Sequence, residues 1–224
     1  WETVLGEAKA AGIPVILSDR MIKVTDDSLY VAWVGGNFIK EGHNAIEWLD
    51  NYLKENGRDN EDINIVLLQG TIGSSAQIGR TQGVEELLAD RPKYHLLAKQ
   101  TGEFTQAKGQ EVMESFLKSY PDIDVVIAEN DDMGYGAMEA IRAAGKVPGK
   151  DIIMISYDAG RRAFEAILKG DLNATIECNP LHGPRVAEII QKLEKGEPVE
   201  KIQYVDEGVF DIKNAAEVLP TRAY

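Results

Sequence analysis

The sequence is poor in the residues on which several kinds of site depend. Its 224 residues include one cysteine, Cys178, and three histidines, His43, His95 and His182. A single cysteine cannot form an internal disulfide, so the cysteine content does not reveal the redox compartment. The histidines fall on different predicted elements without the spacing of metal ligands, and we therefore expect no metal site.

Positive charge and long apolar runs are also scarce. The chain has 24 lysines and arginines against 37 aspartates and glutamates, which gives a net charge of −13. An acidic surface repels nucleic-acid phosphates, so we expect no nucleic-acid partner. No apolar run approaches the roughly 20 residues needed to cross a bilayer, so we expect no direct membrane insertion.

Familiar catalytic signatures are missing too. The loop Gly70-Thr71-Ile72-Gly73 resembles a phosphate cradle superficially, but it lacks the lysine of a P-loop. The chain contains no G-x-S-x-G elbow, no HExxH and no CxxC motif. No group of residues requires catalysis, so the sequence predicts a protein that is not an enzyme and needs no cofactor.

What the chain does contain is a regular alternation of short apolar runs and amphipathic segments. Strands are predicted at 13–17, 30–34, 63–68, 94–98, 125–128, 152–156 and 174–176, with one or two more in 202–224. Helices are predicted at 2–11, 37–56, 75–89, 105–119, 131–144, 160–169 and 184–195. This alternation is typical of an α/β fold with parallel sheets flanked by helices.

Polar and aromatic side chains gather where these strands end, which is where ligands bind in open α/β sheets. The candidate ligand-binding residues are Asp19, Arg20, Arg80, Phe104, Asn130, Tyr157, Asp158 and Glu177. Carboxylates, amides and guanidinium groups can grip neighbouring sugar hydroxyls in pairs, and an aromatic ring can pack on the apolar face of a sugar. The set therefore favours a sugar as the ligand.

Each candidate also has a simpler interpretation. Asp19 and Asp158 can be helix caps or loop carboxylates, and Arg20 and Arg80 can be surface arginines that pair with nearby acids. The aromatic candidates can be core residues. The residues alone leave these alternatives open.

Three stretches of the chain resemble the ribose/galactose class of periplasmic sugar-binding proteins, and within it the galactofuranose type of bacterial ABC importers. The stretches are Leu17-Ser18-Asp19-Arg20, the run from Leu68 to Ala76 followed by Arg80 and Gly83, and Glu129-Asn130-Asp131-Asp132-Met133 followed by Gly136-Ala137. The resemblance runs from Trp1 to about residue 212, and the order and spacing of the motifs make it specific.

The resemblance implies a two-lobed, type I binding-protein fold that closes on one sugar. It implies ligand contacts from residues matching Asp19, Arg20, Arg80, Phe104, Asn130, Tyr157 and Asp158. Two positions depart from the ribose pattern, which has glutamine at Cys178 and phenylalanine at Tyr157. These departures argue against ribose itself, whereas Glu177 resembles the galactofuranose type.

The same resemblance predicts the domain boundaries. Residues 1–35 and 177–206 correspond to part of the first lobe, and residues 36–176 and 207–224 correspond to the second lobe. The chain begins at Trp1 without a methionine or signal peptide, and we expect the first lobe to be incomplete by roughly 80 residues, at 30 or more per βαβ unit. An incomplete sheet exposes an edge, so we also expect self-association.

The predicted function is capture of a monosaccharide, galactofuranose or a related aldose, for delivery to the membrane permease of an ABC importer. This function implies a periplasmic or extracytoplasmic location, with a lipid anchor as an option in the complete protein. The alternative is the effector-binding domain of a LacI-type transcription regulator, which shares the fold. A sugar-converting α/β enzyme is the weaker third hypothesis.

Overall fold

The computed structural model describes all residues from 1 to 224, and these divide into two compact units. Unit 1 comprises Trp1–Asn37 and Asn179–Glu207, and unit 2 comprises Phe38–Cys178 and Gly208–Tyr224. The boundaries expected from the sequence lie within about two residues of these. The assignment of the units as two lobes of one binding protein stays a prediction.

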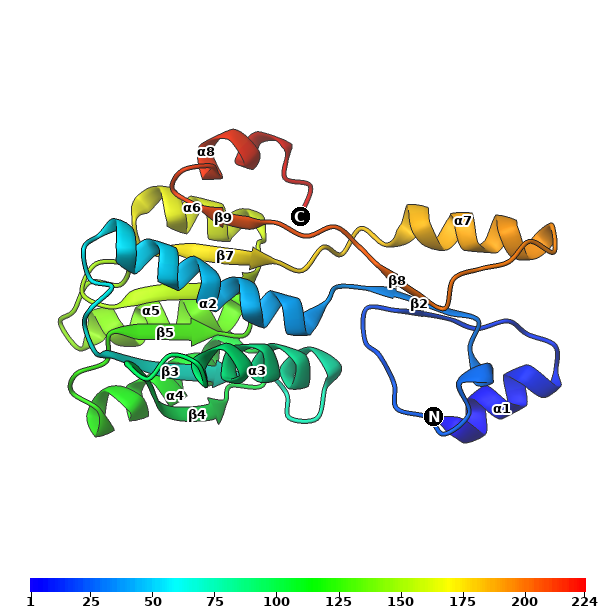
Figure 1. Cartoon of the computed structure of the whole chain (residues 1–224), viewed down its shortest axis with the longest axis horizontal. Helices are drawn as coiled ribbons and strands as arrows, with labels where there is room; N and C mark the ends of the chain where they lie inside the picture. Colours follow the sequence, from blue (N-terminus) through cyan, green and yellow to red (C-terminus); the bar gives the residue numbers. More distant parts are fainter. The chain divides into compact units, whose positions relative to one another are not determined.

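Unit 2 is built on a six-stranded sheet with the strand order β4-β3-β5-β6-β7-β9 (Figure 1). Its strands are β3 (Ile63–Gln69), β4 (Tyr94–Thr101), β5 (Val125–Ala128), β6 (Ile153–Asp158), β7 (Ala174–Glu177) and β9 (Val209–Asp211). All neighbours are parallel except β7 and β9. The sequence predicted parallel sheets only. The antiparallel edge arises because the chain leaves unit 2 after β7 and re-enters it at Gly208, so that Val209 pairs with Ile176 and β9 runs back along β7.

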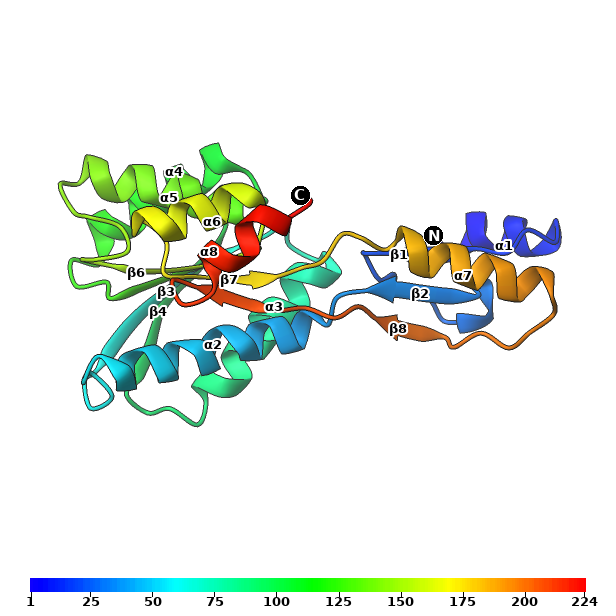
Figure 2. The same cartoon turned by 90° about the horizontal axis from the view of Figure 1, so that it is seen from above.

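Helices cover both faces of this sheet (Figure 2). The helices are α2 (Phe38–Glu55) and α3 (Ser75–Leu88) on one face, and α4 (Gln106–Ser119), α5 (Asp131–Ala143) and α6 (Arg161–Lys169) on the other, with the short α8 (Ala215–Val218) and the 3-10 turn η2 (Leu219–Thr221) near α6. Each face has its own apolar cluster, and the central strands are buried on both sides. Two-sided burial explains why these strands read as continuous apolar runs rather than as alternating ones.

Unit 1 is smaller and has a three-stranded parallel sheet of order β1-β2-β8. Its elements are α1 (Glu2–Ala10), β1 (Ile16–Ser18), η1 (Asp27–Leu29), β2 (Ala32–Gly35), α7 (Gly183–Glu194) and β8 (Ile202–Tyr204). The core cluster consists of Ala32 and Val34 with Ile189 of α7. The first strand begins later than predicted because Ile13 is exposed and Pro14 has no amide hydrogen to give to a ladder.

No helix in the chain combines the length and the apolar character needed to span a bilayer.

Candidate functional site

In unit 2 the connections change direction between two neighbouring strands. The chain leaves β3 to form β4 on one side of it, and then crosses back to form β5 on the other side. The carboxyl ends of β3 and β5 therefore flank a topological switch point, which is where α/β sheets bind ligands. Among the eight candidate residues, Phe104 and Asn130 follow strands of this sheet, and Asp158 and Glu177 are the last residues of strands.

The backbone is strained near the carboxyl ends of several strands in both units. Five residues other than glycine have positive φ, and all follow or end a strand: Asp19, Glu103, Phe104, Asp158 and Ala159. Such conformations cost about 1–3 kcal/mol each and persist only where the surroundings enforce them. Three of the five, Asp19, Phe104 and Asp158, are candidate site residues.

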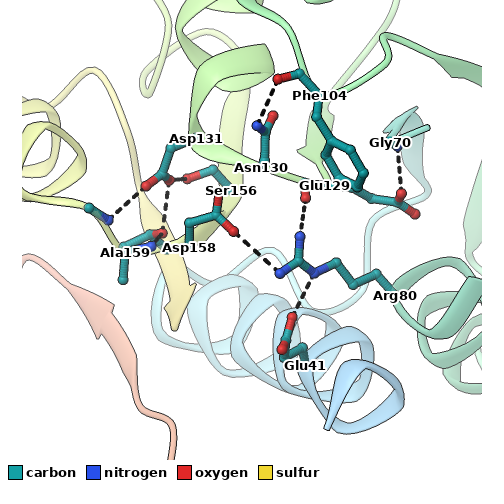
Figure 3. Close-up of polar contacts among 12 residues, drawn as sticks. Glu41, Gly70, Arg80, Phe104, Glu129, Asn130, Asp131, Ser156, Asp158 and Ala159 are labelled. Carbon is teal, nitrogen blue, oxygen red and sulfur yellow. Dashed lines mark hydrogen bonds and ion pairs between the residues drawn. The ribbon is translucent and has the colours of Figure 1, made fainter. Parts of the chain in front are cut away.

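Arg80 of α3 is the centre of the charged network in unit 2 (Figure 3). Its side chain is 3% exposed, and its Nε donates to Glu41 Oε2 at 2.6 Å while its Nη2 donates to Asp158 Oδ1 at 3.3 Å. Its Nη1 donates to the main-chain oxygen of Glu129. Burial alone would lower the pKa of Arg80, but the carboxylates of Glu41 and Asp158 more than offset that effect and raise it well above its usual value.

Two glycines allow the contact between Glu41 and Arg80. A Cβ on Gly42 would lie 2.5 Å from the main-chain oxygen of Arg80, and a Cβ on Gly83 would lie 2.1 Å from the oxygen of Ile39. The backbones of helices α2 and α3 are therefore in direct contact where the two helices cross. The close crossing brings the buried Glu41 of α2 within reach of the guanidinium on α3.

Phe104 forms an aromatic platform beside the end of β3. A Cβ on Gly70 would lie only 1.9 Å from Phe104 Cζ, so the ring lies directly against the backbone of Gly70. The oxygen of Phe104 accepts a hydrogen bond from Asn130 Nδ2 at 3.0 Å, and Thr101 Oγ1 donates to the oxygen of Gly70 at 2.6 Å. Phe104 is half-buried, so part of the residue is held against Gly70 while part of it stays in contact with solvent.

Asn130 and Glu129 support the platform from β5 and the start of α5. Asn130 Oδ1 caps α5 by accepting from the amide of Met133 at 2.9 Å. Glu129 Oε2 accepts from the amide of Gly70 at 2.7 Å, and its Oε1 accepts from Thr81 Oγ1 at 2.5 Å. Burial raises the pKa of Glu129 to about 7 despite these hydrogen bonds.

Asp158 presents the most accessible carboxylate of the unit 2 candidates. Its side chain is 43% exposed, whereas Arg80 and Asn130 are almost entirely buried. The ion pair with Arg80 holds one of its oxygens, and the carboxylate still has surface open to solvent. A carboxylate in this position can accept hydrogen bonds from two neighbouring hydroxyls.

Tyr157 differs from the expectation. It has no exposed surface and packs in the apolar cluster under α2 and α3, with the Arg80 guanidinium 4.9 Å from its ring centroid. Successive side chains of a strand point to opposite faces, so a residue next to Asp158 was bound to face elsewhere. Tyr157 therefore supports Arg80 and offers no surface for a ligand in this conformation.

Glu177 also differs from the expectation, because its carboxylate is occupied within unit 2. It pairs with Arg222 at 2.5 Å, accepts from Tyr224 Oη at 2.5 Å and accepts from the amide of Gly208 at 2.8 Å. Its exposed fraction is 9%. The structure thus gives Glu177 a role in fastening the C-terminal segment, and its predicted ligand contact has no support in this geometry.

The remaining two candidates, Asp19 and Arg20, lie in unit 1 after β1. Their side chains pair with each other, with Nε and Oδ2 3.0 Å apart, and both are about half exposed. The indole nitrogen of Trp33 donates to the main-chain oxygen of Asp19 at 3.0 Å, which helps to hold its positive φ of 64°. The structure thus groups Arg80, Phe104, Asn130 and Asp158 in unit 2, and it groups Asp19 with Arg20 separately in unit 1.

Sequence reasoning missed three buried carboxylates behind the site: Glu41, Glu129 and Asp131. Two of them adjoin the predicted Asn130 in the chain, so their position after β5 was a usable signal. Glu41 had no such signal, because its role depends on the crossing of α2 and α3.

Comparison with known families identifies the class of protein. Residues 1–197 match the model of a periplasmic binding protein domain. That match covers most of the chain, and the chain therefore belongs to this family. The resemblance noted in the sequence is confirmed, and the fold is that of the type I periplasmic binding proteins.

Several individual proteins are similar to the chain. The galactofuranose-binding protein YtfQ of Escherichia coli is 42% identical over 199 residues, which cover 87% of this chain and 61% of the relative. The chain thus spans about three fifths of the length of that relative. A Mycobacterium smegmatis protein in complex with β-D-fucofuranose is 44% identical, with a TM-score of 0.91 over 97% of this chain and 71% of the other.

A third similar protein is the binding component of a Shewanella arabinose ABC transporter, solved with α- and β-L-arabinofuranose. It is 40% identical and has a TM-score of 0.92 over 100% of this chain and 73% of the other. Each of these three proteins is named for, or was solved with, a sugar in its furanose form, which has a five-membered ring.

Proposed function

We propose that the chain is the ligand-binding part of a solute-binding protein that captures a monosaccharide for an ABC importer. Two observations at this edge of unit 2 carry the proposal: Arg80 holds the exposed carboxylate of Asp158, and Asn130 holds the main-chain oxygen of Phe104, whose ring lies against Gly70. Paired planar groups for hydroxyls and an aromatic face for C–H groups are what a sugar requires.

The proposed ligand is an aldose in its furanose form, with galactofuranose or a related sugar as the first candidate. A furanose ring carries hydroxyls on adjacent carbons, and the exposed carboxylate of Asp158 can accept from two of them. The sugars in the names of the similar proteins support the same choice. We propose that the protein acts by binding and release rather than by catalysis, because the similar proteins are named for the sugars that they bind.

The proposal extends to the setting of the complete protein. Its partner is the membrane permease of the importer, and its location is periplasmic or otherwise extracytoplasmic, with a lipid anchor as one form of attachment. The family match supports this setting.

Calorimetry on the full product of the gene, with a panel of pentoses and hexoses, tests the proposal. We expect saturable heat with L-arabinose or D-galactose, both of which populate furanose forms. Tight binding of an amino acid or peptide with no heat from any sugar would overturn it. Catalytic turnover of a sugar in the same samples would overturn the claim that the protein is not an enzyme.

Sugar affinities of variants test whether Asp158 and Asn130 contact the ligand. Asp158→Asn and Asn130→Ala should each weaken binding by roughly 10- to 100-fold, since one lost partner in a desolvated site costs about 1–3 kcal/mol. Asp132→Asn removes one charge from an exposed neighbour on α5 and serves as the matched control. Arg80→Ala is a poorer probe, because it leaves Glu41 buried without its counter-charge.

We also propose that the chain 1–224 self-associates through unit 1. Both outer strands of its sheet, β1 and β8, pair only with β2 and so offer open edges. Light scattering should show particles larger than a 24.7 kDa monomer. A monodisperse monomer at all concentrations would contradict this.

A further inference from the structure

The turn that carries Asp158 has an unfavourable backbone. Asp158 has a φ of 102° and Ala159 a φ of 58°, and neither is a glycine. Two such residues in succession cost about 1–3 kcal/mol each. The turn therefore keeps its shape only if neighbouring groups hold it.

A buried carboxylate and a buried hydroxyl provide that restraint (Figure 3). Asp131 Oδ2 accepts from the amide of Gly160 at 2.9 Å, and its Oδ1 accepts from Ser156 Oγ at 2.5 Å and from Thr175 Oγ1 at 3.1 Å. Thr175 Oγ1 in turn accepts from the amide of Ala159 at 3.1 Å. The backbone amides of Ala159 and Gly160, the two residues after Asp158, are thus held by Thr175 and Asp131.

The cost of placing a carboxylate there indicates that it does more than fill space. Asp131 is 6% exposed, and burial raises the pKa of its carboxyl above the usual range, with the charge of Asp158 adding to the effect. An apolar residue would pack at this point without that cost. An apolar residue could not, however, accept from the amide of Gly160 and from two hydroxyls at once.

We infer that Asp131 is a positioning residue, which aims the carboxylate of Asp158 by holding the amides of the turn that follows it. The inference rests on the proposed role of Asp158 in sugar binding. Asp131 itself touches no ligand, because it lies beneath the turn. From the other side Arg80 Nη2 reaches Asp158 Oδ1, so the carboxylate is fixed between a charged donor and a backbone restraint.

Four variants test the inference. Asp131→Ala removes the acceptor for the amide of Gly160 and for the two hydroxyls. Thr175→Val removes the hydroxyl that accepts from the amide of Ala159 while keeping the shape of the side chain. Asp131→Asn is the conservative variant, because its oxygen can still accept from Gly160 while the two hydroxyls rotate to accept from its amide group. Asp132→Ala, on the exposed neighbouring residue, is the matched control for the loss of a charge at the start of α5.

The first measurement needs no sugar. In the isotope-labelled chain, Asp131→Ala and Thr175→Val should shift or broaden the amide resonances of Asp158, Ala159 and Gly160, while resonances from the middle of β3 stay in place. Asp131→Asn should largely restore the turn, and Asp132→Ala should leave it unchanged. Unchanged resonances in both Asp131→Ala and Thr175→Val would overturn the inference.

The second measurement is sugar affinity in the full product of the gene. Asp131→Ala and Thr175→Val should weaken binding by roughly 10- to 100-fold, Asp131→Asn by at most about three-fold, and Asp132→Ala not measurably. Parent-like affinity in the first two variants would overturn the inference even if the turn moves. If the parent binds no sugar, the proposed function fails, and the sugar-free resonances still decide whether Asp131 holds the turn.

Discussion

The sheet of unit 2 is covered by helices on both faces, whereas the sheet of unit 1 has three short strands and a cluster of three buried apolar residues. The contrast is visible on the surface as well. Unit 1 is the smaller unit, yet it contributes seven of the twelve large apolar side chains that are exposed: Trp1, Val4, Ile13, Leu181, Ile190, Ile202 and Tyr204. Because burial of apolar surface is the main stabilising term, unit 2 should supply most of the stability of this chain.

The contrast predicts a large difference in hydrogen exchange. Amides of β3 and β5 should exchange at least roughly a thousand-fold more slowly than those of β1, β2 and β8, which is about 4 kcal/mol in opening free energy. Native-state exchange followed by mass spectrometry of peptides from each strand measures this. Equal protection of Ile65–Leu68 and Ala32–Val34 would show that the two units unfold together.

A truncation in the core of unit 2 sharpens the comparison. Leu49 on α2 is fully buried in the cluster under the sheet, and Leu49→Ala should lower the unfolding free energy of unit 2 by about 2–5 kcal/mol. Urea denaturation followed by far-ultraviolet circular dichroism reports mainly on unit 2, because most of the helical residues belong to that unit. The control, Ile212→Ala at an exposed site, should stay within about 0.5 kcal/mol of the parent.

A pH dependence should belong to unit 2 through Glu129. Its pKa in the folded protein, about 7, lies above the ordinary glutamate value of 4.5. The stability linked to its proton is therefore fully present below about pH 4.5 and is lost as the pH rises through about 7. Relative to Glu129→Gln, the parent should lose about 3 kcal/mol of unfolding free energy over that range.

Urea denaturation of both proteins between about pH 4.5 and 8 measures the difference. Thr81 Oγ1 already accepts from Gln69 and Gln77, so it cannot also accept from the amide group of a glutamine, and the variant carries an offset in stability that does not depend on pH. The slope of the difference against pH is therefore the quantity to compare. Parallel curves for the two proteins would contradict the raised pKa.

The smallest expected effect concerns the aromatic platform. Gly70→Ala places a Cβ where the Phe104 ring now lies, so the ring must move and sugar affinity should fall roughly ten-fold, or about 1.4 kcal/mol. Gly134→Ala on α5 is the matched control, because its Cβ would meet its nearest neighbour at 3.4 Å. Calorimetry with the best sugar compares the two variants. Parent-like affinity in Gly70→Ala would remove Phe104 from the site.

The sequence was sufficient to predict which candidate residues lie at strand ends. A buried strand is an apolar run, and the first polar residues after the run mark where the strand ends. Phe104, Asn130 and Asp158 were predicted in this way, and Arg80 was predicted from the helix that follows β3. The burial of Tyr157 was not predicted, because adjacent residues of a strand face opposite sides, and which side faces the core depends on the helices that cover it. Glu41 was missed because the crossing at Gly42 and Gly83 is a property of packing between two helices.

The same limit applies to Glu177. Its partner Arg222 lies 45 residues further along the chain, and no periodic pattern links the two positions. Long-range ion pairs of this kind depend on the tertiary fold, so a local pattern could not show that its carboxylate was already occupied.

The central claim is that the switch point of unit 2 binds a sugar. An amide-resonance titration of the full product of the gene with L-arabinose and D-galactose tests it most directly. The account predicts saturable shifts at Phe104, Asn130, Asp158 and Ala159, with no change at Gly149 and Asn173 near the opposite ends of the strands. Saturable shifts confined to other residues, or no shifts with either sugar while an amino acid moves these four resonances, would contradict it.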